Sequence, residues 1–254
     1  MVTRQSLENF LNSLFRPELF SDYCPNGLQV EGKENIERIA FSVSATVDSV
    51  SQAVEKKADA LIVHHGLFWK FHGARSITGP FSKRVKPLVQ NEINLFGHHL
   101  PLDANEEVGN AKSLADLLEL QDLRPFGEYK GAPLGMKGRF LKPINAIELQ
   151  KKLKALLNRE VWHACPQSSQ EIHNLGIITG GANSEWTFCL DEGLEAYLTG
   201  EMSEHDWHES QEAGIHMYAG GHHATEKFGI QSLQKLLEKN FEIETFFIDS
   251  NNPA

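Results

Sequence analysis

Three pairs of adjacent histidines are the residues of this chain best suited to chemistry. They are His64-His65, His98-His99 and His222-His223. Carboxylates follow two of these pairs closely, Asp103 after the second and Glu226 after the third. Imidazole is the commonest metal-binding side chain, and Asp and Glu are the usual carboxylate ligands that accompany it. Because adjacent side chains of an extended segment point to opposite faces, one pair at a strand end can serve two neighbouring ions. The pattern indicates a multinuclear metal site.

Each pair follows a short apolar run that predicts a β-strand, at residues 60–63, 93–96 and 216–219. Parallel α/β sheets bind ligands beyond the carboxyl ends of their strands, because loops from several strands converge there. Two further predicted strands end in Thr179-Gly180-Gly181 and Thr199-Gly200-Glu201. Glycine lets the backbone approach a ligand closely. Glu201 is a candidate general base, with a helix-capping or solvated glutamate as the alternative.

The elements that must position these residues alternate between helix and strand. Hydrophobic periodicity predicts helices over 3–15, 47–55, 82–91, 144–157, 184–192, 203–213 and 225–238. It predicts further strands over 38–43, 138–141, 175–179, 196–199 and 242–248. The fold class expected is α/β, with two packed αβ lobes, mixed and largely parallel sheets, and the metal site in the cleft at the strand carboxyl ends.

A boundary between the lobes is expected in the segment 121–137. Pro125, Gly127, Gly131, Pro133 and Gly135 crowd into it, and it separates two halves of similar element order. We therefore expect an N-terminal lobe of residues 1–127 and a C-terminal lobe of residues 128–254. The halves share no repeat at the level of residues, so any kinship between them is architectural.

Composition narrows the functional classes. The formal net charge of -10 argues against general affinity for nucleic-acid backbones, although a local basic groove remains compatible with it. No apolar run approaches membrane-spanning length, and residues 1–6 lack the hydrophobic core of a secretory signal, so a cytoplasmic protein is expected. Cys24, Cys165 and Cys189 are isolated and lack CxxC spacing, which predicts inert thiols rather than disulfides or a cysteine zinc site.

Four motifs together resemble the dinuclear metal-centre family of YbgI type, whose members are often labelled GTP cyclohydrolase 1 type 2 homologs. The motifs are DYCPNGLQVEG at 22–32, VHHG at 63–66, HLPLD at 99–103 and GHHATE at 221–226. The resemblance spans the whole chain, which is similar to compact members without an extra domain between the halves. It implies two-lobed αβ subunits that assemble as toroidal hexamers.

The resemblance also implies a set of metal ligands. They are His64, His65, Asp103, His222 and Glu226. His64 and Asp103 are expected to hold one ion, His65 and His222 the other, and Glu226 both. His99 matches a family histidine that is either a weaker ligand or a support for one, and His98 stands where an aromatic residue is expected. Histidine with carboxylate suits zinc, iron, manganese, nickel or cobalt.

The remaining polar clusters have weaker patterns. The run from His205 to Glu209 falls within an amphipathic helix, where surface or supporting positions are expected, although His208 could face the site. Turn chemistry explains Asn26-Gly27, while the resemblance places this loop beside the metal cleft. Four histidines without a partner pattern are expected to be structural: His72, His163, His173 and His216.

Charge balance suggests the kind of substrate. Two divalent ions with Asp103 and Glu226 leave excess positive charge, which a hydroxide and an anionic, phosphate-bearing small molecule can neutralise. Water bound to a divalent ion ionises near neutral pH, so hydrolysis needs no serine or cysteine nucleophile. A metal-dependent hydrolase is therefore the favoured function, and the family label points to opening of the guanine ring of GTP with release of formate.

Other functions stay open at the level of sequence. The chain contains no P-loop and no guanine-reading motif, so hydrolysis of another phosphoester or an amide is the main alternative. A non-catalytic metal carrier or sensor would be distinguished by a closed coordination sphere. An oligomeric scaffold around another macromolecule is the third class, and an acidic lumen would make DNA an unfavourable partner.

Overall fold

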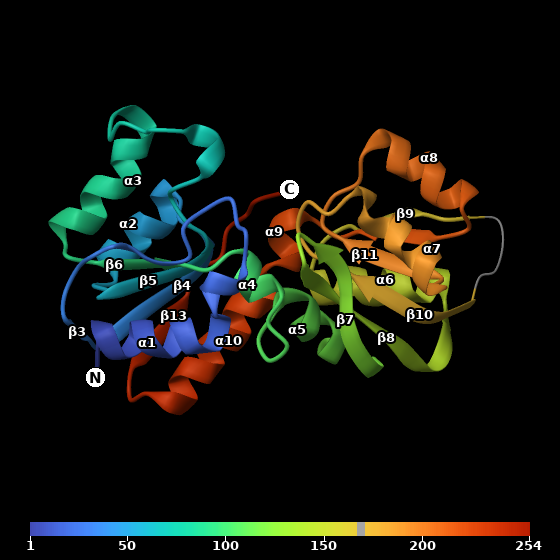
Figure 1. Cartoon of the computed structure of the whole chain (residues 1–254), viewed down its shortest axis with the longest axis horizontal. Coiled ribbons are helices and arrows are strands. Elements are labelled where there is room, and N and C mark those ends of the chain that lie inside the picture. The colour runs from blue at the N-terminus through green and yellow to red at the C-terminus, as the bar shows by residue number, and fades with distance from the viewer. Residues whose placement is uncertain (167–170) are drawn as a thin grey trace. The chain divides into compact units, whose positions relative to one another are not determined.

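The computed structural model describes residues 1–166 and 171–254 of the chain (Figure 1). These residues form two compact units. The first unit comprises Met1–Val108 and Ile230–Asn251, and the second comprises Gly109–Gly229 and Asn252–Ala254. Each unit contains its own sheet and its own helices, so the predicted α/β class is confirmed.

The first unit is built on a sheet of strand order β13-β4-β5-β6-β2. Its strands are β1 (Val2–Thr3), β2 (Gly27–Val30), β3 (Asn35–Ile36), β4 (Arg38–Ser44), β5 (Ala60–His65), β6 (Asn94–Gly97) and β13 (Glu244–Phe247). Its helices are α1 (Arg4–Phe15), η1 (Pro17–Leu19), α2 (Val47–Glu55), η2 (Lys70–His72), α3 (Gly79–Gln90), α4 (Leu100–Asp103) and α10 (Lys227–Asn240), the last from Ile230 onward. Strands β13, β4, β5 and β6 pair in parallel, whereas β2 is antiparallel to β6.

Both faces of this sheet are covered, which explains why its central strands are apolar at almost every position. Ile39 and Ile62 pack on one face with side chains of α1 and α10, while Ala40 and Leu61 pack on the other with α2 and α3 (Figure 1). Strands buried on both faces read as continuous hydrophobic runs because no side chain meets water. The histidines that end β5 and those that follow β6 therefore mark the strand ends.

The second unit is built on a sheet of strand order β7-β8-β10-β11-β12-β9. Its strands are β7 (Gln121–Tyr129), β8 (Ala132–Asn145), β9 (Trp162–Ala164), β10 (Glu171–Ile177), β11 (Ala196–Thr199) and β12 (His216–Ala219). Its helices are α5 (Asn110–Leu117), α6 (Ala146–Leu157), η3 (Ser184–Thr187), α7 (Phe188–Glu192), α8 (Glu204–Glu212) and α9 (His222–Thr225). Strands β10, β11 and β12 are parallel neighbours, and the flanking pairs are antiparallel.

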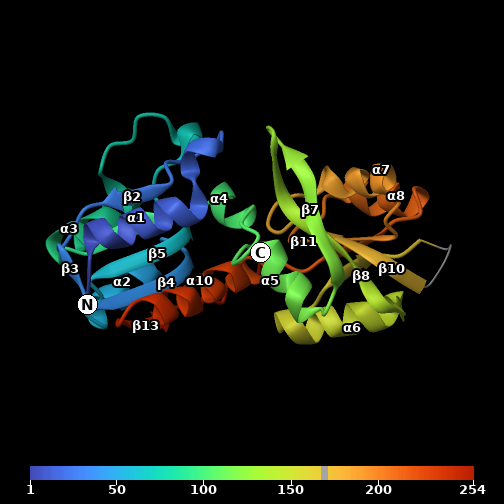
Figure 2. The same cartoon turned by 60° about the horizontal axis from the view of Figure 1, so that its bottom comes forward.

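Helices lie on both sides of this second sheet as well (Figure 2). Leu149 and Leu153 of α6 pack with Leu198 and Tyr218 on one face, and Trp186 packs with Met217 on the other. Asn145 caps α6 by accepting a hydrogen bond from the Ile147 amide, which satisfies one of the otherwise unpaired donors of the first turn.

The compact units divide the chain at other positions than the predicted lobes 1–127 and 128–254. The segment 121–137, expected to be a linker, contains β7 and the start of β8, which form a β-hairpin. Lys130 (φ 50°) and Gly131 (φ 87°) form its two-residue turn, where left-handed backbone matches the twist of the strands. Glycine and proline here mark turns and an edge strand rather than a boundary.

Other differences concern short elements. The helices α4 and α5 and the strands β7 and β9 were not predicted, because short or edge elements carry little hydrophobic periodicity. Within residues 1–166 and 171–254, none of the helices has the combined length and apolar character that a membrane span requires.

Candidate metal centre

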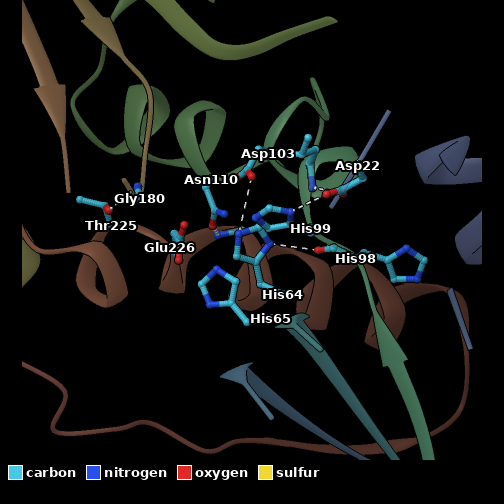
Figure 3. A network of polar contacts seen from close by, with 12 residues as sticks. Asp22, His64, His65, His98, His99, Asp103, Asn110, Gly180, Thr225 and Glu226 are labelled. Atoms are coloured by element: carbon cyan, nitrogen blue, oxygen red, sulfur yellow. Dashed lines mark hydrogen bonds and ion pairs between the residues drawn. The ribbon is translucent and has the colours of Figure 1, made fainter. Parts of the chain in front are cut away.

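In the first unit, the ends of two adjacent parallel strands bring three histidines together. His64 and His65 end β5, and His99 follows β6 (Figure 3). Each of the three offers a ring nitrogen, and these atoms lie within 4.8 Å of one another. Helix α4 begins directly after His99 and ends at Asp103, whose Oδ2 lies 3.6 Å from His64 Nε2. The predicted clustering of these residues at strand carboxyl ends is thus present in this unit.

The same nitrogen of each ring is held by the protein. His64 Nδ1 donates to the carbonyl of His98 at 3.0 Å, and His65 Nδ1 lies 3.0 Å from Ser44 Oγ at the end of β4. His99 Nδ1 lies 2.8 Å from Asp22 Oδ1 (Figure 3). Anchoring through Nδ1 fixes the orientation of an imidazole and directs Nε2 toward an ion, which is the usual arrangement of metal-bound histidine.

Asp22 anchors His99, a contact that sequence reasoning missed. Its buried carboxylate accepts hydrogen bonds from His99, from Asn26 Nδ2 at 2.9 Å and from the Leu100 amide at 3.0 Å. Burial raises the pKa of Asp22, but these hydrogen bonds and the charge of His99 outweigh it and lower the pKa to about 2. Asn26 Oδ1 also accepts from the His99 amide at 2.8 Å, so the 22–26 loop supports His99 directly.

Two glycines allow Gln29 to brace the neighbouring loops. A Cβ atom at Gly66 would lie 2.3 Å from Gln29 Nε2, and one at Gly97 would lie 2.6 Å from the same atom. Gln29 Oε1 accepts a hydrogen bond from the Leu67 amide at 2.8 Å. Any side chain at these glycines would displace Gln29, so they are close-approach positions beside His65 and His98.

The backbone carbonyl of His98 accepts the hydrogen bond from His64, whereas the imidazole ring of His98 is buried. The side chain is fully buried, its centroid lies 4.5 Å from that of Phe15, and neither ring nitrogen has a hydrogen-bond partner among the described residues. Burial, together with the nearby His64, lowers the pKa of His98 to about 3. The ring is neutral at pH 7 and fills an apolar space, as expected for a residue that replaces an aromatic side chain.

In the second unit, His222 and Glu226 face each other across one helical turn. His222 opens α9 after the end of β12, and its Nε2 lies 3.2 Å from Oε1 of the buried Glu226. His222 Nδ1 lies 2.5 Å from Glu201 Oε1, which follows β11. Burial lowers the pKa of His222, but hydrogen bonds and charges from Glu226 and Glu201 outweigh it and raise the pKa to about 9. Two carboxylates therefore favour a cation at this imidazole.

Gly180, which follows β10, leaves the space that this group needs. Its φ is +71°, and a Cβ atom there would lie 2.3 Å from Glu226 Oε1 and 3.2 Å from His222 Nε2. Its amide donates to Thr225 Oγ1 at 3.2 Å (Figure 3). The three parallel strands β10, β11 and β12 thus supply Gly180, Glu201 and His222 to one group.

Glu201 is neither a helix cap nor a fully solvated residue. Helix α8 begins at Glu204 and is capped by Ser203, whereas the Glu201 carboxylate hydrogen-bonds to His222 and its side chain is 46% exposed. It therefore orients His222 and is also open to solvent. Its assignment as a general base stays a prediction.

Helix α8 carries most of the remaining predicted residues. Asp206 is buried and accepts hydrogen bonds from Trp186 Nε1 at 3.1 Å and from the Ser203 amide at 3.1 Å, so it has a structural role in α8. His205 and His208 are exposed on the same helix, as the amphipathic pattern predicts, and His208 lines a cavity together with Glu201. Cys24 is buried, and burial and Asp22 raise the pKa of its thiol, as expected of an inert cysteine.

Comparison with known proteins agrees with the motifs. The model of the Duf34/NIF3 (NGG1p interacting factor 3) family matches residues 2–253. A Pasteurella multocida (strain Pm70) relative named GTP cyclohydrolase 1 type 2 homolog is 40% identical over 248 residues, covering 98% of each chain. A Vibrio cholerae relative of the same name is 40% identical over 251 residues, again covering 98% of each chain. The solved structure of protein ybgI, titled as of unknown function, aligns over 100% of both chains with a TM-score of 0.93 and 39% identity. The predicted resemblance is confirmed.

Proposed function

The chain belongs to the Duf34/NIF3 family, and from this premise we propose that it is a metal-dependent hydrolase that uses two divalent transition-metal ions. One observation carries the proposal. His64, His65, His99 and His222 are each held by a protein partner at Nδ1, which directs Nε2 toward an ion. A solvated or structural histidine has no need of this shared orientation.

The donor groups of each unit fit a divalent ion chemically. His64 Nε2 and Asp103 Oδ2 are 3.6 Å apart, and His222 Nε2 and Glu226 Oε1 are 3.2 Å apart. Ligands of one ion at bond lengths of roughly 2.0–2.2 Å lie about 3–3.6 Å apart. Each unit supplies an incomplete set, so we propose the division that the resemblance implies. In this division His64 and Asp103 would hold one ion, His65 and His222 would hold the other, and Glu226 would serve both, with His99 as an additional or supporting ligand.

The residues of the chain would divide the remaining work. The ions, when bound, supply Lewis acidity and positive charge toward an anionic substrate. Glu201 Oε1 accepts a hydrogen bond from His222 Nδ1 and keeps that ring oriented. Because the Glu201 side chain is 46% exposed, it can also pass a proton to or from solvent.

A cavity in the second unit supports a small aromatic anion as the substrate. It has a volume of about 510 Å³ and is lined by Glu201, Arg159, Trp162 and Trp207 among others. This volume is in the range of small-molecule sites. Trp162 is 67% exposed and offers a ring for stacking on a heterocycle. Arg159, which also lines the cavity and donates to the Pro253 and Ala254 carbonyls, supplies positive charge toward a phosphate. A nucleotide such as GTP matches this chemistry and the names of the relatives.

Other phosphoesters and amides remain alternatives within the same proposal. A non-catalytic metal carrier or sensor is the second functional class, and no feature of the cavity requires this function. We also propose that the protein is cytoplasmic and forms a homohexameric toroid, as the family resemblance implies. Light scattering coupled to size-exclusion chromatography tests the hexamer independently of activity.

The proposal is tested by metal analysis and a substrate screen on purified protein. Native protein, Glu226→Gln and the matched control Glu212→Gln are compared on nucleotides, phosphoesters and amides with added zinc, iron, manganese, nickel or cobalt. Glu212 lies in the same unit and is exposed at the end of α8, outside the lining of the cavity. We expect metal-dependent turnover in native protein and in Glu212→Gln, and its loss in Glu226→Gln.

Other results would separate the alternatives. Unchanged turnover in Glu226→Gln would place the chemistry elsewhere. Stable metal binding with no turnover on any substrate would favour a carrier. For the division of ligands, His222→Ala should lose mainly one ion, and loss of neither ion from this variant would contradict the shared centre.

A further inference from the structure

Two adjacent strands of the second unit carry a second group of metal-binding side chains. His163 lies on the edge strand β9, Cys165 directly follows that strand, and His216 opens β12. From their placement we propose that these three residues form a separate site for a zinc-class ion, with one thiolate and two imidazoles as ligands. The proposal is independent of the function assigned above.

The strand register brings the three residues to one face of the sheet. Strands β9 and β12 are antiparallel, with His163 opposite Tyr218 and Ala164 opposite Met217. Extending this register by one residue beyond the end of β9 sets Cys165 opposite His216. Because side chains alternate along a strand, His163, Cys165 and His216 all point to the same side. In sequence, this is a His-x-Cys segment pairing with a His-x-Tyr segment.

The distances fit coordination. Nε2 of His163 and Nδ1 of His216 are 3.1 Å apart, and ligand atoms of all three residues lie within 4.8 Å of one another. In a tetrahedral zinc site, bonds of about 2.0–2.1 Å to nitrogen place two nitrogens about 3.4 Å apart. Small side-chain rotations would therefore suffice to bring the three donors around one ion.

The surroundings orient the ligands in advance. The ring of His163 stacks on that of Tyr218, with centroids 4.3 Å apart and planes 16° apart. The Tyr218 hydroxyl donates to the Ala146 carbonyl at 2.9 Å, which fixes the phenol ring on α6. His216 is 2% exposed and His163 is 9% exposed, so water competes little for their nitrogens.

Binding of an ion at this site requires the release of one thiol proton and the shift of one imidazole proton. The Cys165 thiol, whose Sγ lies 3.6 Å from the Pro166 carbonyl, loses its proton to solvent. In the hydrogen bond between His163 and His216, one ring donates, and that ring moves its proton to its other nitrogen on binding. The complex then holds a divalent ion, one thiolate and two neutral imidazoles, with a position left for water or another small ligand.

This site is distinct from the candidate metal centre. His216 opens β12, whereas His222 follows the opposite end of the same strand. The donor chemistry also differs, because a thiolate selects softer ions than a histidine and carboxylate set. The ligands proposed for the centre include no cysteine, and this difference provides a selective readout.

Cobalt(II) is the probe for this site. Thiolate ligands give bound cobalt an intense near-ultraviolet charge-transfer band that imidazole and carboxylate ligands do not produce. We expect metal-free protein titrated with cobalt to develop this band, zinc to displace it, and Cys165→Ser to abolish it. Cys24→Ser is the matched control, because Cys24 is the other cysteine near metal-binding side chains, Asp22 and His99. His163→Gln should weaken the cobalt affinity measured from this band at least tenfold.

A second measurement needs no variant. Iodoacetamide should modify Cys165 in metal-free protein, and zinc should slow this modification at least tenfold, as peptide mass spectrometry would show. Absence of a thiolate band together with equal alkylation with and without zinc would overturn the proposal. Loss of the band in Cys24→Ser but not in Cys165→Ser would also overturn it. If zinc still protects Cys165 from alkylation in the double variant His64→Ala/His222→Ala, the site binds zinc without the candidate metal centre.

Discussion

The buried ring of His98 leads to a quantitative prediction about acid stability. The perturbation is His98→Phe, which replaces the imidazole with the aromatic side chain expected at this position. In the folded protein, burial and His64 lower the pKa of His98 from 6.5 to about 3. A histidine with a lowered folded pKa stabilises the fold fully above its unfolded pKa, and this contribution is lost as the pH falls toward the folded value. Native protein should therefore lose stability below pH 6.5 for a reason that the variant lacks.

The magnitude follows from proton linkage. Between pH 7 and about pH 4.5, the unfolded chain gains one proton at this position that the folded protein does not bind, which costs about 2.5 kcal/mol. Fitting a larger ring beside Phe15 adds an overpacking penalty of about 1–3 kcal/mol at every pH, offset by removing two buried nitrogens without partners. The pH-dependent difference, rather than the absolute stability, is thus the diagnostic quantity.

The assay is urea unfolding of metal-free protein across this pH range, with a chelator present so that metal release does not contribute. The free energy of unfolding of His98→Phe, relative to native protein, should rise by about 2.5 kcal/mol between pH 7 and about pH 4.5. His98→Leu is the control, because it removes the same imidazole with a different shape and should show the same pH-dependent rise. A constant difference between native protein and both variants would refute a buried, neutral His98.

Three further predictions concern the residues around the candidate centre. Gly180→Ala and its control Gly193→Ala should each lower the free energy of unfolding by about 1–3 kcal/mol, because both glycines have positive φ. Only Gly180→Ala should also lower the metal content measured by elemental analysis, because only its Cβ would meet Glu226. Asp22→Asn should lower the free energy of unfolding by about 2 kcal/mol at pH 7, because the folded pKa of Asp22 is lowered to about 2. Native protein should lose this contribution as the pH falls below about 4, so the acid unfolding curves of native protein and Asp22→Asn should converge there. Glu201→Gln should weaken divalent-ion affinity roughly 10–100-fold in chelator competition, because the amide supports His222 less well, and an unchanged affinity would remove Glu201 from the ligand support.

The sequence alone determined the kind of fold and the ends of the strands where ligands were expected. Runs such as 60–63 are apolar at every position and then change abruptly to histidine, so burial and chemistry are both readable from local order. The turn from His222 to Glu226 was equally local, because residues four apart on a helix face each other. Four short motifs were sufficient to identify the family.

Contacts between distant segments were decided only by tertiary structure. Asp22 anchors His99, Ser44 anchors His65 and Gln29 occupies the space beside Gly66, and in each case the partner lies in another segment of the chain. Tertiary structure also decides that residues 230–251 return to the first unit, where β13 pairs with β4. Local periodicity encodes which face of an element is buried, but not which distant element covers it.

The group of His163, Cys165 and His216 shows the same limit most directly. Each residue looked isolated in sequence, and the histidines were expected to be structural and the cysteine inert. Only the antiparallel register of β9 and β12 brings them to one face, because pairing between distant strands depends on the fold as a whole. Sequence determined which residues could bind a metal, whereas strand pairing decided which of them meet.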